Sequence, residues 1–500
     1  KSICPTSTLT FSADEAGRYF ILISATNAGG TTEKEIRIDV FQLDVPTISI
    51  ADADKGFKVL QGSELTITPI VDSFLETSYS WQINGEDISN ELTCTLPTIE
   101  LGEYQVRFAT HNEDGDDEVT FKVEVCSPDQ VDFNWTFLQT EYNMSAGRTI
   151  RIKPVDVNNA LDAVYTWTVD NEQVQSGEND TYLFTSEQQG EHTVKVEMKN
   201  SYILATQTLK VNVCPPAGTY QRKISATSSA SMNKVYEYLP APGQFINENH
   251  NTTTMAEACT YAEERINQTA YVSLGGFGGY IIVGFDHSIV NDGDYNIAIT
   301  GNAFDGSSEP GIVWVMQDEN GDGLPNDTWY ELRGSEYGKA ETWQDYAVTY
   351  HKPTGIQLPT PWTDNHGQSG SIDYLGAFHR QDYYYPAWVK EKQYTLRGTR
   401  LKERNYDQSG NGTYWVNDSY EWGYADNFSA IDRLTDDDNY NAGPSDNHFK
   451  ISHAVTFDGK DANLKYVDFI KVQVGVNSKS GWLGEISTEV FGIKDFNMLK

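Results

Sequence analysis

The chain has 500 residues, and its 72 acidic side chains outnumber its 36 lysines and arginines, which gives a formal net charge of −36. A surface this acidic repels the phosphates of nucleic acids and of anionic lipids, so we expect no nucleic-acid partner, whereas it can recruit calcium. The length predicts three or four domains. No apolar run approaches the roughly 18 residues of a membrane-spanning helix, so we expect no transmembrane segment in this chain.

A repeated pattern organises the first 215 residues. It consists of a glycine, an alternating apolar segment, an asparagine and a second alternating segment, and it starts at Gly17, Gly102 and Gly190. The aligned asparagines are Asn27, Asn112 and Asn200, so the repeat lengths are 112 − 27 = 85 and 200 − 112 = 88 residues. Such lengths are typical of an immunoglobulin-like sandwich. We therefore predict a partial module at 1–44 and complete modules at 45–127 and 128–216.

The two complete modules each contain a tryptophan at an equivalent position. Tyr79-Ser-Trp81 and Tyr165-Thr-Trp167 precede a turn and lie about one strand pair before the glycine of the repeat. Because side chains alternate along a strand, each pair shares one face, and we expect Trp81 and Trp167 in the core between two sheets.

These modules resemble the PKD-like repeats of bacterial surface proteins. The tryptophan followed by a turn, and the glycine-to-asparagine strand pair, carry the resemblance over about 215 residues. The resemblance implies immunoglobulin-like spacers that hold another domain away from the cell. A partner-binding role is the alternative.

Residues 217–500 form a different domain, rich in Gly, Asn, Asp and aromatic residues. Short segments bounded by turn residues predict strands at 280–285, 295–300, 311–316, 347–350 and 467–474. Only 254–267 has helical spacing of its apolar residues. The glycine-rich segment 274–279 precedes a strand and not a helix, so it predicts a turn or tight packing. The predicted fold is thus all-β, with tandem immunoglobulin-like (PKD-like) sandwiches followed by a larger jelly-roll-like β-sandwich with long loops.

One loop of this domain has the residue types of a calcium site. Oxygen-bearing side chains stand at positions one, three, five and ten, with Gly323 at six, as in the calcium loops of thrombospondin-type repeats, which it resembles. The predicted ligands of a structural calcium ion are Asp318, Asn320, Asp322, Leu324 and Asp327. Trp329 replaces the glutamate that an EF-hand requires. The alternative is a turn held by its own side-chain hydrogen bonds.

No motif of catalysis is present, so we expect a protein that is not an enzyme. The chain lacks H-E-x-x-H, G-x-S-x-G and a phosphate-binding loop with its lysine. Five scattered cysteines predict neither a disulfide framework nor a zinc site. His366 lies in a near match to the D-x-H-x-x-G motif that ligates corrinoid cobalt, with Ser369 in place of the glycine. The acidic run 436–438 is interpreted as a solvated turn.

Two groups of aromatic residues stand among polar neighbours and predict a ligand site. Three consecutive tyrosines cannot all face one core in an extended segment, so at least one should reach solvent or a ligand. A platform of rings and polar groups suits a ligand with amides or hydroxyls. The predicted ligand-binding residues are Arg380, Tyr383, Tyr384, Tyr385, Trp388, Trp415, Tyr420 and Trp422. Packing of these loops onto the sandwich is the alternative.

The C-terminal domain also resembles a family of surface lipoproteins of Gram-negative gut anaerobes. The segments that carry this resemblance start at Val235, Ser273, Gly301 and Val467 and span nearly all of 218–500. Members of the BtuH type bind vitamin B12. The resemblance implies a cobalamin-binding lipoprotein on the extracellular face of the outer membrane, anchored by a lipidated segment upstream, that passes a corrinoid to an outer-membrane transporter. A surface glycan-binding or adhesion protein with a PKD-like stalk is the alternative.

Overall fold

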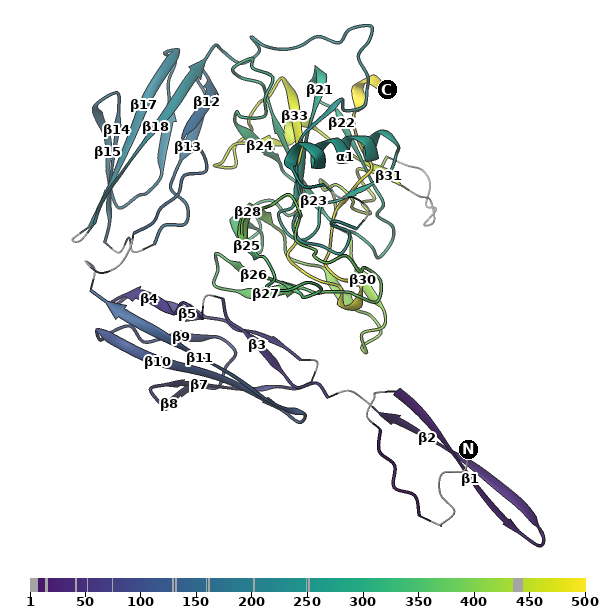
Figure 1. Ribbon diagram of the computed structural model, residues 1–500. Helices are drawn as coiled ribbons and strands as arrows, with labels where there is room; N and C mark the ends of the chain where they lie inside the picture. The colour runs from purple at the N-terminus through teal and green to yellow at the C-terminus, as the bar shows by residue number, and fades with distance from the viewer. Residues whose placement is uncertain are drawn as a thin grey trace. The chain divides into compact units, whose positions relative to one another are not determined.

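The structure is a computed structural model of residues 1–500 (Figure 1). It describes residues 8–500 except 14–16, 41–42, 52, 74, 128–129, 131–132, 159, 161, 201–202, 249, 251 and 435–443. The acidic run 436–438 and Cys4 therefore lie outside the described residues. Within the part that is described, no helix is long and apolar enough to cross a membrane.

The chain divides into two compact units. The first comprises residues 1–58, 66–96 and 102–124, and the second comprises 59–65, 97–101 and 125–500. The predicted all-β fold is confirmed, since α1 is the one α-helix among the described residues. Cys94, Cys214 and Cys259 are free thiols.

The N-terminal segment forms a β-hairpin of two long strands. Strands β1 (Gly17–Asn27) and β2 (Gly30–Val40) pair antiparallel along their whole length. Asn27 closes the turn, because its Oδ1 accepts a hydrogen bond of 2.7 Å from the amide of Gly29. The hairpin exposes apolar side chains, among them Phe20 and Leu22.

The first complete module has one five-stranded sheet in the order β4-β11-β10-β7-β8 and two strand pairs, β3-β6 and β5-β9. The bounds are β3 (Thr47–Ser49), β4 (Phe57–Leu60), β5 (Leu65–Ile67), β6 (Ile70–Asp72), β7 (Ser78–Ile83), β8 (Glu86–Ser89), β9 (Cys94–Leu96), β10 (Gly102–Asn112) and β11 (Gly115–Cys126). The repeat asparagine Asn112 ends β10, where its Oδ1 accepts from the amides of Asp114 and Gly115.

The second complete module repeats this arrangement. Its five-stranded sheet has the order β12-β18-β17-β14-β15, beside the pair β13-β16. The bounds are β12 (Glu141–Ser145), β13 (Thr149–Ile152), β14 (Val164–Val169), β15 (Glu172–Gly177), β16 (Tyr182–Thr185), β17 (Gly190–Lys199) and β18 (Leu204–Cys214). Strand β12 pairs parallel with β18, whereas the pairs of β14 with β15 and β17 are antiparallel.

The prediction for the module tryptophans is confirmed. Trp81 and Trp167 have no exposed surface, and each lies on the strand of its module that precedes the turn. The ring of Trp81 packs 4.5 Å from that of Phe108, while Trp167 stacks on Tyr182 at 5.5 Å. Large aromatic rings between the sheets supply much of the buried apolar area of such small modules.

The C-terminal domain is built on a six-stranded sheet in the order β19-β21-β33-β23-β24-β32, with a four-stranded sheet β27-β26-β25-β28 and a three-stranded sheet β31-β22-β35. The six strands are β19 (Lys234–Leu239), β21 (Tyr280–Val290), β23 (Gly311–Met316), β24 (Trp329–Leu332), β32 (Ala454–Val455) and β33 (Tyr466–Val474). The other two sheets contain β22 (Ile297–Gly301), β25 (Trp343–His351), β26 (Thr360–Asp364), β27 (Ser369–Ile372), β28 (Gln393–Arg400), β31 (Ser445–Phe449) and β35 (Gly492–Asp495).

Short pairs and turns complete the domain. They are β20 (Val272–Ser273) with β34 (Glu489–Val490), β29 (Asn405–Asp407) with β30 (Trp415–Asn417), and the 3-10 turns η2 (Ile451–His453), η3 (Gly481–Leu483) and η4 (Phe496–Met498). All five predicted strands are present at or near their expected positions. One apolar core joins residues of the three sheets, including Val283, Ile299 and Val348.

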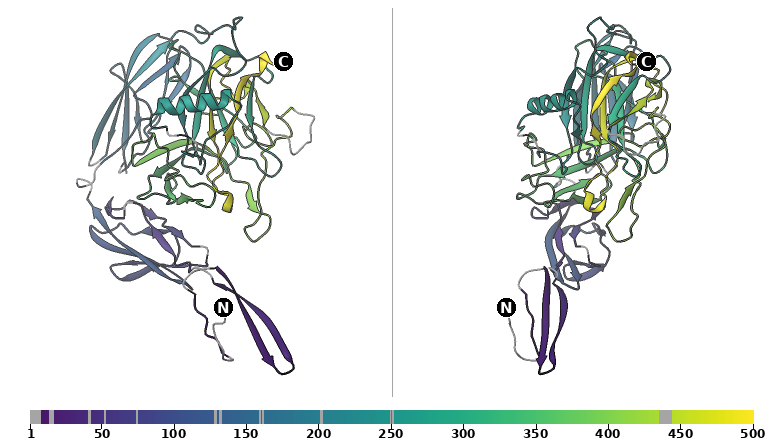
Figure 2. Two further views of the ribbon diagram at one scale, coloured as in Figure 1. Left: turned by 45° about the vertical axis from the view of Figure 1, so that its right-hand side comes forward. Right: turned by 90° about the vertical axis from the view of Figure 1, so that its right-hand side faces the viewer.

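The predicted helix is α1 (Met255–Asn267). It starts at Thr254, whose hydroxyl caps the amide of Glu257 at 3.2 Å. Ala258, Ala262 and Ile266 face the core, as their spacing requires. The helix packs against the edge strand β19, and Figure 2 shows it on the outside of the domain.

The glycine-rich segment 274–279 is a site of tight packing, as predicted. A Cβ atom on Gly279 would lie 1.8 Å from the carbonyl oxygen of Leu274 and 2.3 Å from the amide nitrogen of Ala241. The backbone itself uses this close approach, because the amide of Ala241 donates to the carbonyl of Leu274 at 3.0 Å.

Candidate functional site

The structure corrects half of the predicted ligand-binding set. Tyr384 and Tyr385 are each 1% exposed, Tyr420 is 2% exposed and Trp388 is 6% exposed. Tyr384, Tyr385 and Trp388 belong to the main core, while Tyr420 belongs to a second, smaller cluster. These four side chains are therefore core residues.

The polar atoms of the buried rings are satisfied within the protein. The hydroxyl of Tyr384 donates to the carbonyl of His379 and accepts from the amide of Leu375, both at 3.0 Å. The hydroxyl of Tyr385 donates to the carbonyl of Glu391 at 2.9 Å. Burial raises the pKa of Tyr384 to about 12. These rings thus have no free polar group to offer a ligand.

The other four predicted residues reach solvent to different degrees. Arg380 is exposed, and Tyr383 is partly exposed while it packs against the main core. Trp415 is partly buried in β30. Trp422 is the member of the predicted set that lines the pocket described below.

The predicted calcium loop is held by its own hydrogen bonds. The carboxylate of Asp318 accepts from the amides of Gly321 and Gly323, at 2.7 and 3.0 Å. Asp322 accepts from the side-chain amides of Asn320 and Asn326, both at 2.8 Å. The carboxylates of the loop do not gather as three groups around one point among the described residues. This arrangement is the self-bonded turn that was the alternative, and calcium binding at the loop stays a prediction.

His366, which lies in the near match to the corrinoid-binding motif, packs against an aromatic ring. Its imidazole stacks on the indole of Trp343 at 4.3 Å, with the two planes only 8° apart. The stacked ring is exposed to solvent, and its role as a cobalt ligand stays a prediction.

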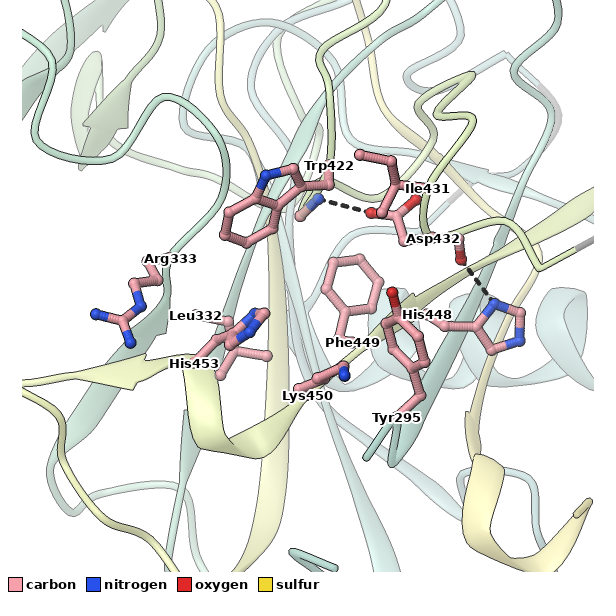
Figure 3. Close-up of a pocket in the computed structure, with 11 residues that line it drawn as sticks. Tyr295, Leu332, Arg333, Trp422, Ile431, Asp432, His448, Phe449, Lys450 and His453 are labelled. Atoms are coloured by element: carbon pink, nitrogen blue, oxygen red, sulfur yellow. Dashed lines mark hydrogen bonds between the residues drawn. The ribbon is translucent and has the colours of Figure 1, made fainter. Parts of the chain in front are cut away.

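The candidate site is a pocket of about 260 Å³ in the C-terminal domain (Figure 3). Its walls come from β24, β31 and η2 and from the loops around Tyr295, Trp422 and Ile431. The lining residues are Tyr295, Leu332, Arg333, Trp422, Gly423, Ile431, Asp432, His448, Phe449, Lys450 and His453.

Aromatic and imidazole rings form the walls of this pocket. Trp422 and His453 lie 5.1 Å apart, and Tyr295 lies 6.0 Å from His448. In Figure 3 the rings of Trp422, Phe449 and His453 surround the same space. Flat apolar walls of this kind favour a planar ring as ligand.

Two cations stand at the pocket, and both have partners that are exposed to solvent. Arg333 forms an ion pair of 2.8 Å with Asp461, and Lys450 forms one of 3.6 Å with Asp294. Lys450 also lies 4.6 Å from the centre of the Tyr295 ring. Because exposed ion pairs are weak, an anionic group of a ligand can compete for either cation.

The pKa values of the two histidines are both lowered. Burial lowers the pKa of His448, and burial together with Arg333 and Lys450 lowers that of His453. The Nδ1 atom of His448 lies 2.8 Å from the backbone carbonyl of Asp432, and not from its carboxylate. The Asp432 carboxylate accepts instead from the amide of Gly423 at 2.6 Å.

The residues that line the pocket in the described part of the chain include no serine, threonine or cysteine. Of these residues the sequence predicted only Trp422, because the lining residues are spread over 453 − 295 = 158 positions and share no local motif.

A second surface feature is a pair of exposed aromatic rings, and the sequence did not predict that these two rings lie together. Phe378 is 64% exposed and Trp482 is 50% exposed, and their rings lie 6.3 Å apart. Leu483 beside them is also exposed. An exposed pair of rings on a polar surface is a feature of binding sites for flat or sugar-like ligands.

The match to a protein-family model agrees with the modular fold. A model of the PKD-like domain family matches residues 45–112 and 117–200. The fibronectin(III)-like modules of Clostridium thermocellum CbhA are similar at 15% identity and a TM-score of 0.19, over 36% of this chain and all of theirs. The Ig1-2 module of the Drosophila receptor protein tyrosine phosphatase DLAR is similar at 12% identity and a TM-score of 0.17, over 34% of this chain and 97% of that one. No curated protein matches the sequence.

Proposed function

We propose that this chain is a cell-surface protein that captures a corrinoid in its C-terminal domain and passes it to an outer-membrane transporter. The observation that carries the proposal is the pocket around Trp422, with aromatic walls and two cations. The resemblance of residues 218–500 to cobalamin-binding surface lipoproteins points to the same ligand. In this proposal the PKD-like modules are the stalk, and a lipidated segment anchors the protein.

The chemistry of the pocket fits one part of cobalamin. Cobalamin has a nucleotide arm that combines a planar base with a phosphate. A volume of about 260 Å³ lies just below the range of about 300–1,000 Å³ that holds a whole drug-sized ligand. The arm would therefore enter once its base has left the cobalt, with the base against the rings of Trp422 and His453 and its phosphate near Arg333 and Lys450, while the corrin ring stays at the surface beside the exposed Ile431.

A titration with two corrinoids tests this proposal. Cyanocobalamin carries the nucleotide arm, and dicyanocobinamide has the same corrin ring without it. We expect cyanocobalamin to bind with submicromolar affinity in calorimetry and cobinamide to bind at least about 100-fold more weakly, since the pocket contacts supply a few kcal/mol. If neither corrinoid gives a binding signal, the proposed function is wrong. If both corrinoids bind with equal affinity, the nucleotide arm does not bind in the pocket.

A surface glycan is the second candidate ligand, and the exposed pair Phe378 and Trp482 favours it. Aromatic rings at the surface can stack against sugar rings, and Arg380 nearby in sequence adds hydrogen-bond donors. Affinity gels cast with mucin or plant polysaccharides would retard the chain in that case. The variant Trp482→Ala should then migrate freely, whereas Trp422→Ala should still be retarded.

A further inference from the structure

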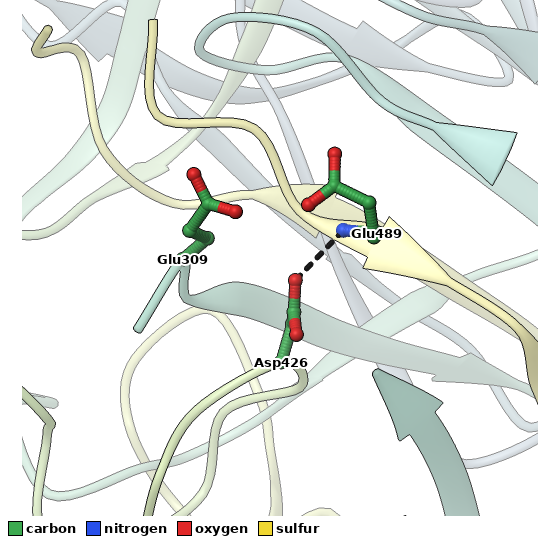
Figure 4. Close-up of side chains that lie close together, drawn as sticks. All are labelled: Glu309, Asp426 and Glu489. Carbon is green, nitrogen blue, oxygen red and sulfur yellow. Dashed lines mark hydrogen bonds between the residues drawn. The ribbon is translucent and has the colours of Figure 1, made fainter. Parts of the chain in front are cut away.

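Three carboxylates from distant parts of the chain meet inside the C-terminal domain (Figure 4). Glu309 lies just before β23, Asp426 lies in the loop that bridges to β23, and Glu489 starts β34. Each offers an oxygen atom, and these atoms all lie within 4.8 Å of one another. In Figure 4 the side chains of Glu309 and Glu489 point toward each other above Asp426.

Backbone amides hold Asp426 in a fixed position. Its Oδ1 accepts from the amides of Asn302 and Ala303, at 2.7 and 2.9 Å. Its Oδ2 accepts from the amide of Glu489 at 2.8 Å. In the orientation that satisfies the side-chain amide of Asn302, its nitrogen also donates to Oδ1 at 3.1 Å and to Oδ2 at 3.3 Å. The group is thus held in one orientation by backbone and side-chain amides.

Glu489 supplies an independent sign that a partner belongs here. Its side chain is 4% exposed and aimed at the cluster, and its Oε1 accepts no hydrogen bond. A buried carboxylate oxygen without a partner costs free energy, so native proteins seldom leave one empty. Glu485, close by in the chain, has a second such oxygen, Oε2.

The cluster also lacks compensating charge. Among the described residues, no lysine, arginine or histidine forms an ion pair with Glu309, Asp426 or Glu489. Three carboxylates this close together, two of them buried, must either bind protons or share a cation.

We propose that Glu309, Asp426 and Glu489 together hold a divalent cation, and that calcium is the ion. Calcium takes oxygen ligands at about 2.3–2.6 Å, so two ligands on opposite sides of one ion lie about 5 Å apart, close to the spacing of this cluster. Magnesium would demand stricter octahedral geometry and would keep several waters. Glu309 is only partly buried, so it gives the ion a path from solvent.

Such an ion would join three segments that are otherwise separate in sequence. The backbones already touch there, because the amide of Glu309 donates to the carbonyl of Asp426 at 2.9 Å. The hydroxyl of Thr488 donates to the carbonyl of Glu309 at 2.8 Å. The ion would lock β34 and the start of β23 to the loop that contains Asp426, and it would stabilise the domain that carries the pocket. The inference does not depend on the identity of the pocket's ligand.

The experiment compares the full chain before and after removal of calcium with a chelator. We expect one tightly bound calcium per chain by metal analysis and calorimetry, and a higher melting temperature with calcium than with the same concentration of magnesium. The variant Glu489→Gln keeps the shape of the side chain but loses the charge. It should bind calcium roughly 100-fold more weakly or not at all, because affinity follows the number of charged ligands.

A matched control separates this site from the loop at 318–327. Asp322→Asn removes an exposed carboxylate of that loop and should leave the tight calcium in place. Glu309→Gln is a second test at the partly exposed edge of the cluster, and it should behave as Glu489→Gln does. Calcium binding that survives both glutamine variants, or a wild-type chain that binds no calcium, would overturn the proposal and leave a cluster of protonated carboxyls.

Discussion

The indole ring of Trp422 lies 5.1 Å from the imidazole ring of His453, centre to centre, with 57° between their planes. Trp422 comes from a loop and His453 from the 3-10 turn η2, so the two rings meet only in the folded domain. Because both rings face the pocket, they are the groups most suited to contact a planar ligand.

Replacement of this indole should weaken binding of cyanocobalamin. Stacking of a base on an aromatic side chain is worth about 1–3 kcal/mol, so Trp422→Ala should raise the Kd by roughly 5- to 150-fold. Trp422→Phe should retain most of the affinity. The control is Trp482→Ala, which removes an exposed ring far from the lining residues in sequence. Equal losses in both alanine variants in calorimetry would place the ligand elsewhere.

The sequence predicted features that depend on local pattern, and it failed for features that depend on tertiary contact. Trp81 and Trp167 follow from strand alternation, and α1 follows from its N-cap at Thr254 and its apolar spacing. The alternation argument does not extend to Tyr383–Tyr385, because that segment is not a strand, and two of its three rings turn inward.

The pocket and the acidic cluster had no sequence signal. Glu309, Asp426 and Glu489 are 426 − 309 = 117 and 489 − 426 = 63 positions apart in a chain with 72 acidic residues. A single acid in such a chain carries no information about its neighbours in space. Only the antiparallel bridge between Gly311 and Ala425, together with the position of β34, brings these groups together.

Tyr384→Phe tests whether this tyrosine is a core residue. The hydroxyl bridges the carbonyl of His379 and the amide of Leu375, so its removal leaves two backbone groups without their partner. We expect a loss of about 1–3 kcal/mol in the free energy of unfolding, measured by urea denaturation. Binding of cyanocobalamin at saturating folded protein should be unchanged. If Tyr384→Phe instead keeps its free energy of unfolding but no longer binds cyanocobalamin, Tyr384 is part of the ligand site.

Gly279→Ala should destabilise the C-terminal domain severely. The added Cβ would lie 1.8 Å from the carbonyl oxygen of Leu274, and a clash with backbone cannot be relieved by a change of rotamer. We expect a cost of at least about 3 kcal/mol, read as a lower melting temperature or loss of soluble protein. Gly355→Ala is the control, since its new Cβ would meet only the end of the flexible Leu358 side chain, at 3.2 Å.

Glu331 should make the domain less stable as the pH rises. Burial raises its pKa from 4.5 to about 7, although the hydroxyl of Thr399 donates to its carboxylate at 2.5 Å. The carboxyl of Glu331 binds its proton more tightly in the folded state than in the unfolded state. The stability that this bound proton contributes is therefore fully present below pH 4.5 and is lost between pH 4.5 and 7. This shift of the Glu331 pKa corresponds to a change of about 3 kcal/mol in the free energy of unfolding. Glu331→Gln should flatten the fall of melting temperature in that window, and an unchanged profile would contradict the assignment.

His250 should act in the opposite direction. Its imidazole lies 4.0 Å from the ring of Tyr261, and burial lowers its pKa from 6.5 to about 4. The unfolded state binds the proton more tightly, so the stability that the neutral imidazole contributes is complete above pH 6.5 and is lost as the pH falls toward 4. The free energy of unfolding should fall by about 3 kcal/mol at most.

The variant His250→Phe separates this effect from those of the carboxylates. Phenylalanine keeps a ring against Tyr261 and cannot bind a proton, although it loses the hydrogen bond of 2.8 Å between Nδ1 of His250 and the hydroxyl of Thr252. Its melting temperature should therefore start lower than that of the wild type at pH 7.5 and fall less between pH 6.5 and 4. If the melting temperatures of the two proteins change with pH in parallel, His250 does not take up a proton on unfolding, and this prediction is wrong.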